Sequence, residues 1–229
     1  MGKKIAMIQS NYLPWKGYFD IINLVDEFVL YDEVQFTKND WRNRNQIKTP
    51  TCKDWITIPV LQKNLGQKIS ETIVVDNFWR KKHWKTIVQN YKKAKFFRTY
   101  APIFENLYLN REEIFLSKIN HQFIKAVNSI LGIKTKIVFD NQYELRGSKT
   151  ERIIHICKQA GASEYISGPS GKNYIEENLF EETDIALTYF DYSGYPEYSQ
   201  LFGAFDHAVS IIDLVLNEGP SATNYMKSF

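Results

Sequence analysis

Two short apolar runs near the N-terminus, separated by an amphipathic segment, constrain the fold of this chain most strongly. The first run is 5–8, and the second, 28–31, is bounded by acidic residues, as is typical of a buried parallel strand. Between them, apolar residues recur three and four positions apart, as on one helix face: Tyr18, Ile21, Ile22 and Val25. The pattern predicts a strand at 5–8, a helix at 18–25 and a strand at 27–32.

Strand and helix patterns continue to alternate along the chain. Runs rich in apolar residues predict further strands at 55–60, 69–75, 135–139, 164–167 and 184–189. Helical spacing predicts further helices beginning at 78 and covering 112–131, 148–159 and 210–217. Ser148 with Glu151 three residues later predicts a capping box, and Gly132 stands at an expected helix stop. We therefore expect an α/β protein with an open, mostly parallel sheet in a three-layer core.

The length of 229 residues suits one sizeable α/β domain. We expect a single domain over 1–229, with 77–132 as a helical insertion. Neither an apolar run of about 18 residues nor a signal peptide is present. Cys52 and Cys157 are too few for a disulfide framework or a zinc site. These features predict a cytoplasmic protein without a transmembrane segment; the oligomeric state, a homo-oligomer included, is left open.

Charge is distributed unevenly although the net charge is only +3. The segment 80–98 holds eight Lys or Arg and no acid, whereas 174–226 holds ten acids and no Lys or Arg. The basic segment is either a phosphate-attracting surface or a solvated helix face. The small net charge and the acidic C-terminal part argue against nucleic-acid binding. Aromatic residues make up 15% of the chain, which suits planar or sugar-like ligands as well as an aromatic core.

Polar and aromatic residues follow the first two predicted strands. In open parallel sheets, ligands bind outside the carboxyl ends of the strands, so 9–15 and 32–44 are expected near each other on one rim. Arg42 and Arg44 are the leading anion ligands, unless they pair with nearby acids in a structural network. The substrate-binding candidates on this rim are Gln9, Asn11, Tyr12, Trp15, Gln35, Lys38, Arg42, Asn43, Arg44 and Lys48.

A glycine-containing junction, GPSGKNY at 168–174, follows a predicted strand and would open a helix. Free backbone N–H groups and a helix N-terminus suit a phosphate there, and an ordinary glycine-rich turn is the alternative. The sequence matches neither GxGxxG nor the Walker A pattern. The further binding candidates from this junction are Ser167, Gly168, Ser170, Gly171, Lys172 and Tyr174.

Three residues are candidates for proton transfer: Asp32, Glu33 and His83. His83 lies among aromatics and lysines, where a hydrogen-bonded packing role is the alternative; burial beside cations would keep a base neutral. The chain has no HExxH, CxxC or GxSxG motif, so we expect metal-free chemistry. Such a site works by positioning and electrostatics, which suits acyl, nucleotidyl or phosphoryl transfer.

Several motifs together resemble the WbqC-like protein family: QSNYLPWKGYF, DEFVLYDEVQF, WRNRNQIK, YISGPSG and SIIDLVLNEG. The chain departs from the family pattern QPNYLPW by carrying Ser10, which bears on the rigidity of that loop. The resemblance implies a role in bacterial O-antigen (lipopolysaccharide) or exopolysaccharide biosynthesis, beside enzymes that make amino sugars. It implicates Gln9, Asn11, Tyr12, Trp15, Asp32, Gln35, Lys38, Arg42, Asn43, Arg44 and Lys48.

The order of the elements is also similar to nucleotide-binding, nucleotidyltransferase-like folds of the pantothenate-synthetase type, although fold analogy is weak evidence for function. The first hypothesis is N-acyl or aminoacyl transfer to a nucleotide-linked amino sugar, with acyl-CoA or ATP as co-substrate. A non-catalytic sugar-nucleotide binding module is the second. An ATP-using ligase or nucleotidyltransferase is a further alternative, against which the absence of an HxGH signature counts.

Overall fold

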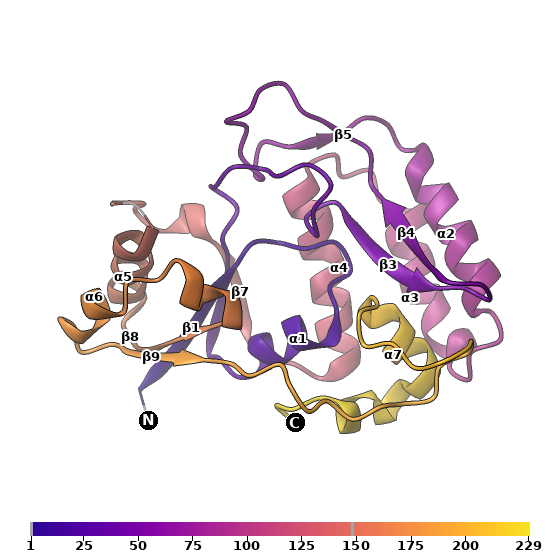
Figure 1. The fold of residues 1–229 in the computed structure, drawn as a ribbon. Coiled ribbons are helices and arrows are strands. Elements are labelled where there is room, and N and C mark those ends of the chain that lie inside the picture. Colours follow the sequence, from indigo (N-terminus) through magenta and orange to yellow (C-terminus); the bar gives the residue numbers. More distant parts are fainter. Residues whose placement is uncertain (1, 148) are drawn as a thin grey trace.

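Five parallel strands form the central sheet of the computed structural model, which describes residues 2–147 and 149–229 (Figure 1). The spatial order is β7-β2-β1-β8-β9, and every adjacent pair is parallel. The strands are β1 (Lys3–Ile8), β2 (Glu27–Leu30), β7 (Lys136–Phe139), β8 (Ala162–Ser167) and β9 (Ala186–Tyr189). The expected α/β fold with an open parallel sheet is confirmed.

Helices cover both faces of the sheet. The described residues form α1 (Lys16–Asn23), α2 (Phe78–Tyr91), α3 (Phe97–Leu109), α4 (Leu116–Leu131), α5 (Lys149–Ala160), α6 (Glu177–Glu181) and α7 (Ile211–Glu218). Ile5 and Met7 of β1 face the core against α5 and α6, whereas Ala6 faces the core against α1, α4 and α7. This period-two alternation is what a strand buried on both faces produces. The core therefore has the expected three layers.

Helix ends follow local sequence signals. Gly132 ends α4 with φ of +76°, in the left-handed region that favours glycine. The Ser210 side chain caps α7 by accepting a hydrogen bond from the Ile212 N–H at 3.3 Å. The capping box predicted at Ser148 lies outside the described residues. α4 begins at Leu116, four residues later than the predicted start at 112.

Two small antiparallel sheets lie outside the central sheet. The first pairs β3 (Arg44–Lys48) with β4 (Lys53–Thr57), and the second pairs β5 (Val60–Leu61) with β6 (Ile73–Val74). The expected strand at 55–60 is divided between β4 and β5, because Pro59 supplies no N–H for a ladder. The expected strand at 69–75 is reduced to β6, and β3 is an additional strand within the polar block 41–48.

The segment 77–132 is mainly helical, since it contains α2, α3 and α4. Its description as an insertion within a single domain stays a prediction. Arg80, the first basic residue of the 80–98 segment, is buried and donates hydrogen bonds to the carbonyl oxygens of Leu107 and Glu113. Among the residues that the structure describes, no helix is long and apolar enough to cross a membrane.

Candidate functional site

The strand order reverses beside β1. From β1 the chain forms β2 and then β7 on one side, and afterwards returns to form β8 and β9 on the other side. The carboxyl ends of β1 and β8 therefore diverge into separate loops, and open α/β sheets bind ligands at such a point. A cavity of about 760 Å³ lies there, lined by residues of both strands and of the loops that follow them. We call it the larger cavity.

Eight residues predicted as substrate ligands line the larger cavity. Four come from the segment after β1 and from the polar block 41–48, and four come from the junction after β8. They are Gln9, Asn11, Trp15, Arg42, Ser167, Gly168, Ser170 and Tyr174. The loop after β1 (residues 9–15, the N-terminal loop) and the turn that begins at Gly168 after β8 (the Gly168 turn) thus face one cavity. The turn forms a 3-10 helix of only five residues, Pro169–Asn173, instead of beginning an α-helix.

The other predicted ligands do not line the larger cavity. Tyr12, Asn43 and Lys48 are buried, whereas Gln35, Lys38 and Lys172 are exposed. The remaining two pack against neighbours: Arg44 lies over the Trp55 ring at 4.1 Å, and buried Gly171 leaves space for Ser167. The Lys48 ammonium group donates to Gln200 Oε1 at 2.7 Å and to the Ala204 carbonyl oxygen. Their predicted roles in binding therefore have no support from this cavity.

Asp32 is buried two residues after the end of β2, and its carboxylate accepts hydrogen bonds from two neighbouring segments. Its Oδ1 accepts from the Ser10 N–H at 2.8 Å, and its Oδ2 accepts from the Ser117 hydroxyl. Burial raises the pKa of the Asp32 carboxyl, and the hydrogen bonds from Ser117 and Ser10 act in the opposite direction. Glu33 forms an ion pair with Lys68 at 2.9 Å. Neither carboxylate lines the larger cavity.

His83 lies on α2 and is buried against Tyr12 of the loop after β1 and Thr57 at the end of β4. Its Nε2 lies 3.1 Å from the Thr57 carbonyl oxygen, which can only accept, so Nε2 carries the proton. Its Nδ1 therefore accepts from the Tyr12 hydroxyl at 3.0 Å. Burial lowers the pKa of the His83 imidazole to about 4. Both ring nitrogens are thus occupied, in a neutral ring away from the larger cavity.

Two cations that sequence patterns did not single out line the larger cavity, namely Lys149 and Arg152 from the first turn of α5. Arg152 donates from Nε and Nη2 to the Gly147 carbonyl oxygen, at 3.2 and 3.0 Å. The signal that could have identified them is position, because α5 follows β7 and therefore begins at the same edge of the sheet. Charge alone would not have separated them from the many surface lysines.

The larger cavity is electropositive. Arg42, Lys149 and Arg152 line it, and no described lining residue is Asp or Glu. Arg42 contacts one carboxylate outside the lining, Asp40, at 2.9 Å. Aromatic rings supply much of the remaining wall: Trp15, Tyr18, Tyr31, Trp41, Tyr165, Tyr174 and Tyr192. Cations beside flat aromatic surfaces suit a ligand with phosphate groups and a planar or sugar ring.

Helix α4 positions the loops that form the site. Asn120 donates from Nδ2 to the Arg42 carbonyl oxygen at 2.8 Å and to the Ser10 Oγ at 3.1 Å. Ser117, three residues earlier on the same helix, donates to Asp32. The loops after β1 and β2 are therefore both attached to one rigid element, which suits a preorganised binding site.

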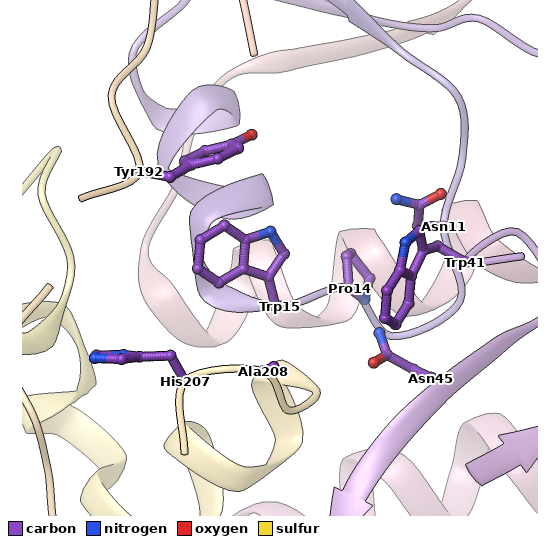
Figure 2. A pocket seen from close by; sticks show the side chains of 8 residues that line it. All are labelled: Asn11, Pro14, Trp15, Trp41, Asn45, Tyr192, His207 and Ala208. Atoms are coloured by element: carbon purple, nitrogen blue, oxygen red, sulfur yellow. The ribbon is translucent and has the colours of Figure 1, made fainter. Parts of the chain in front are cut away.

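A smaller cavity of about 400 Å³ adjoins the larger one (Figure 2). It is lined by Asn11, Pro14, Trp15, Trp41, Asn45, Tyr192, His207 and Ala208. Four of these residues, Asn11, Trp15, Trp41 and Tyr192, also line the larger cavity. Burial and the nearby Lys16 lower the pKa of His207. The two cavities are therefore neighbours across a shared, mostly aromatic wall.

The structure is that of an α/β protein with a cavity at the carboxyl edge of an open parallel sheet. The chain belongs to the WbqC-like protein family, whose model matches residues 9–225. It is 47% identical over 226 residues to a protein from Mycobacterium tuberculosis (strain ATCC 25618 / H37Rv), uncharacterized protein Rv1507c, and the match covers 98% of each chain. No solved structure matches the chain. The family expected from the sequence motifs is thereby confirmed.

Proposed function

We propose that the protein binds a nucleotide-linked amino sugar in the larger cavity and transfers an acyl or aminoacyl group to the sugar amine, as part of O-antigen or exopolysaccharide biosynthesis. The observation that carries the binding proposal is the joint lining of this cavity by Arg42, Lys149 and Arg152 with aromatic rings and no described acid. The proposed biosynthetic role rests on the family resemblance.

The phosphate groups of such a ligand bind at the three cations. Arg152 contributes its guanidinium group, which also donates from Nε and Nη2 to the Gly147 carbonyl oxygen, and Arg42 and Lys149 add charge from neighbouring elements. Charge-assisted hydrogen bonds to phosphate are stronger than neutral ones. The nucleoside or the sugar packs on the aromatic wall, where C–H and π surfaces contact the rings of Trp15 and Tyr174.

The proposed reaction is an amide formation. The amine nitrogen attacks the acyl carbonyl carbon, a C–N bond forms, and the C–S bond of a thioester donor breaks. The thiol leaves with the proton that the amine loses. An aminoacyl adenylate reacts in the same way, with the C–O bond to the phosphate breaking and AMP leaving. The protein contributes by holding the amine and the donor carbonyl close together, and proximity of this kind can lower the barrier by about 7–11 kcal/mol.

A non-catalytic sugar-nucleotide binding module is the second candidate. The observation that favours it is the lining of the larger cavity, in which no described residue is Asp, Glu or His. Asp32, Glu33 and His83 are engaged in hydrogen bonds or ion pairs elsewhere. A binding module would hold the sugar nucleotide for a partner enzyme, with affinity and without turnover.

The experiment measures the affinity of the purified protein for UDP, dTDP and their sugar derivatives by isothermal titration calorimetry. We expect Arg152→Ala to weaken binding roughly tenfold to one-hundredfold, because it removes a charged hydrogen bond worth about 1.5–3 kcal/mol. Arg98→Ala, at an exposed position on α3 outside the cavity lining, is the matched control. Absence of any binding, or equal losses in both variants, would overturn the proposal.

Turnover separates the two candidates. The protein is incubated with nucleotide-linked amino sugars and with acyl-CoA donors, or with ATP and amino acids, and the products are analysed by mass spectrometry. A mass increase that matches one acyl or aminoacyl group supports the transferase. Tight binding with unchanged sugar nucleotides under every donor condition supports the binding module.

A further inference from the structure

We propose that the smaller cavity receives the acyl group that is joined to the sugar amine, so that the amide bond forms at the wall shared by the two cavities. The inference rests on the proposed function, because it takes the sugar nucleotide to occupy the larger cavity. It adds a second subsite, defines its chemical class as apolar acyl, and locates the reacting atoms between the two subsites.

Adjacency of the two cavities is the first support. Asn11, Trp15, Trp41 and Tyr192 line both, so a ligand in the larger cavity that reaches these residues is next to the smaller one. Figure 2 shows the Trp15 and Trp41 indoles on either side of Pro14, with Asn11 beside Trp41. The centroids of the Trp15 and Tyr192 rings are 4.8 Å apart in an edge-on contact, which holds this part of the wall in place.

The chemical contrast between the cavities is the second support. The larger cavity is lined by three cations, whereas the smaller one is lined mainly by indoles, Pro14, Tyr192 and Ala208, with Asn11, Asn45 and the imidazole of His207 as its other polar groups. No described lining residue of the smaller cavity is Lys, Arg, Asp or Glu. Phosphates are therefore favoured on one side of the shared wall and hydrocarbon on the other. An acyl chain buried there gains roughly fourfold in affinity for each methylene group removed from water.

Asn11 is the third support. Its Oδ1 is buried and has no hydrogen-bond partner among the described residues. Buried acceptors are nearly always paired, so an unpaired one at a cavity wall indicates a ligand donor. Asn11 is the residue of the shared wall that carries an amide, and the N–H of the newly formed sugar amide is a donor of the required kind. Asn11 is therefore assigned as the positioning partner of that nitrogen.

Asn45, the other amide of the smaller cavity, plays a different part. Its Nδ2 donates to the carbonyl oxygens of Leu13 and Tyr12, at 2.7 and 3.2 Å, and its Oδ1 accepts from the Gln46 N–H at 2.7 Å. Its polar atoms already have protein partners. Asn45 therefore closes the cavity and holds the loop, while Asn11 is available to the ligand.

The test uses three probes that share one nucleotide and differ in acyl length: UDP-linked glucosamine carrying an N-acetyl, N-butanoyl or N-hexanoyl group. Affinities are measured by isothermal titration calorimetry, with UDP alone as the reference. We expect the affinity of the wild-type protein to rise roughly fifteenfold from acetyl to butanoyl, which differ by two methylene groups. UDP should bind more weakly than any of the three.

Ala208→Phe fills the smaller cavity from an exposed position and is expected to abolish the gain with acyl length while leaving UDP affinity unchanged. Ala208→Leu is a milder second variant, should the larger side chain disturb folding. Ala204→Phe, exposed in the same loop and outside both linings, is the matched control and should keep the gain.

Two results would overturn the inference while leaving the proposed function intact: UDP binding with no dependence on acyl length, or a gain that survives both Ala208 substitutions. Failure of the wild-type protein to bind UDP or any of the sugar nucleotides would instead remove the proposed function, and this inference with it. The outcomes are therefore distinguishable in one set of titrations.

Discussion

The backbone N–H of Tyr12 donates a hydrogen bond to the carbonyl oxygen of Trp41 at 2.9 Å. This bond joins the loop after β1 to the loop after β2, which are 29 positions apart in the chain. The Tyr12 side chain is fully buried, whereas the Trp41 indole is 43% exposed and lines both cavities. A buried anchor thus fixes the position of a cavity-lining ring, and the hydrogen bond joins the two loops into one unit.

Replacement of Asn45 by alanine should destabilise this unit. The Asn45 side chain holds the carbonyl oxygen of Leu13, a non-glycine residue with φ of +44°. Such a conformation persists only where surrounding contacts enforce it. We expect Asn45→Ala to lower the free energy of unfolding by about 1–3 kcal/mol, measured by urea denaturation, because the buried carbonyl oxygens of Leu13 and Tyr12 lose their donor.

Asn64→Ala, in an exposed loop, is the control and should leave the free energy of unfolding within about 0.5 kcal/mol of wild type. An equal loss of stability in Asn45→Ala and Asn64→Ala would contradict the expectation.

Two substitutions of Asp32 separate a structural role from a catalytic one. Asp32→Ala leaves the Ser10 N–H and the Ser117 hydroxyl without their acceptor, so the free energy of unfolding should fall by roughly 2–4 kcal/mol. Asp32→Asn keeps one acceptor oxygen and should cost less. Urea denaturation of both variants checks this, with exposed Asp184→Ala as the control. A folded Asp32→Asn protein that binds UDP normally and has lost all turnover would instead identify Asp32 as a proton acceptor.

Gly17 is expected to be intolerant of alanine although it lies in α1. Alanine is ordinarily favoured over glycine inside a helix by about 0.5–1 kcal/mol. At Gly17 an added Cβ would lie 2.4 Å from Cζ2 of Trp15, so the indole must move within the wall that the two cavities share. Gly17→Ala should change the near-ultraviolet circular dichroism and weaken UDP binding.

Gly66→Ala is the matched control, because its added Cβ meets only Asn64 Oδ1 at 3.8 Å. That variant should keep both the spectrum and the UDP affinity of wild type. Unchanged UDP affinity in Gly17→Ala would show that the Trp15 indole position does not matter for binding.

Protonation of His83 should destabilise the folded protein in acid. Burial lowers its folded-state pKa from 6.5 to about 4, so the neutral form is favoured by folding. This contribution is fully present above pH 6.5 and is lost as the pH falls towards 4. At about 1.36 kcal/mol per pKa unit, the loss is on the order of 3 kcal/mol.

The measurement is the free energy of unfolding against pH for wild type and for His83→Gln, and the difference between the two curves. The difference isolates His83 from other groups, including Asp140, whose pKa is raised to about 6 by burial and whose contribution has the opposite pH dependence. A difference that stays constant between pH 7 and pH 4 would contradict the expectation.

Much of the site's location could be predicted from the sequence, because it depends on strand order and not on side-chain detail. Gln9 follows β1, Ser167 ends β8, and the rule for parallel sheets places both at one edge. The same rule applied to the loop after β7 would have added Lys149 and Arg152. They were not singled out because no local motif distinguishes them from solvent-facing cations.

The roles of individual polar residues were less predictable. In the block 41–48, Arg42 lines the larger cavity, whereas Asn43 is buried and donates to the Ile58 carbonyl oxygen at 2.9 Å. Their side chains diverge where β3 begins its pairing with β4, with Arg44 opposite Thr57. Pairing register decides which side of a strand each residue faces, and it depends on a partner segment distant in the sequence.

The sequence by itself determined the alternating strands and helices, the parallel sheet and the edge at which the cavity-lining loops gather, since periodicity and apolar runs are local properties. Tertiary structure alone decided that Asp32 and His83 are buried in hydrogen-bond networks, and that α4 and α5 deliver Asn120 and Arg152 to the site. Those outcomes depend on the packing of segments far apart in the chain, such as Gln9 and Arg152, which are 143 positions apart and line one cavity. No local pattern encodes the direction in which a side chain points after such packing.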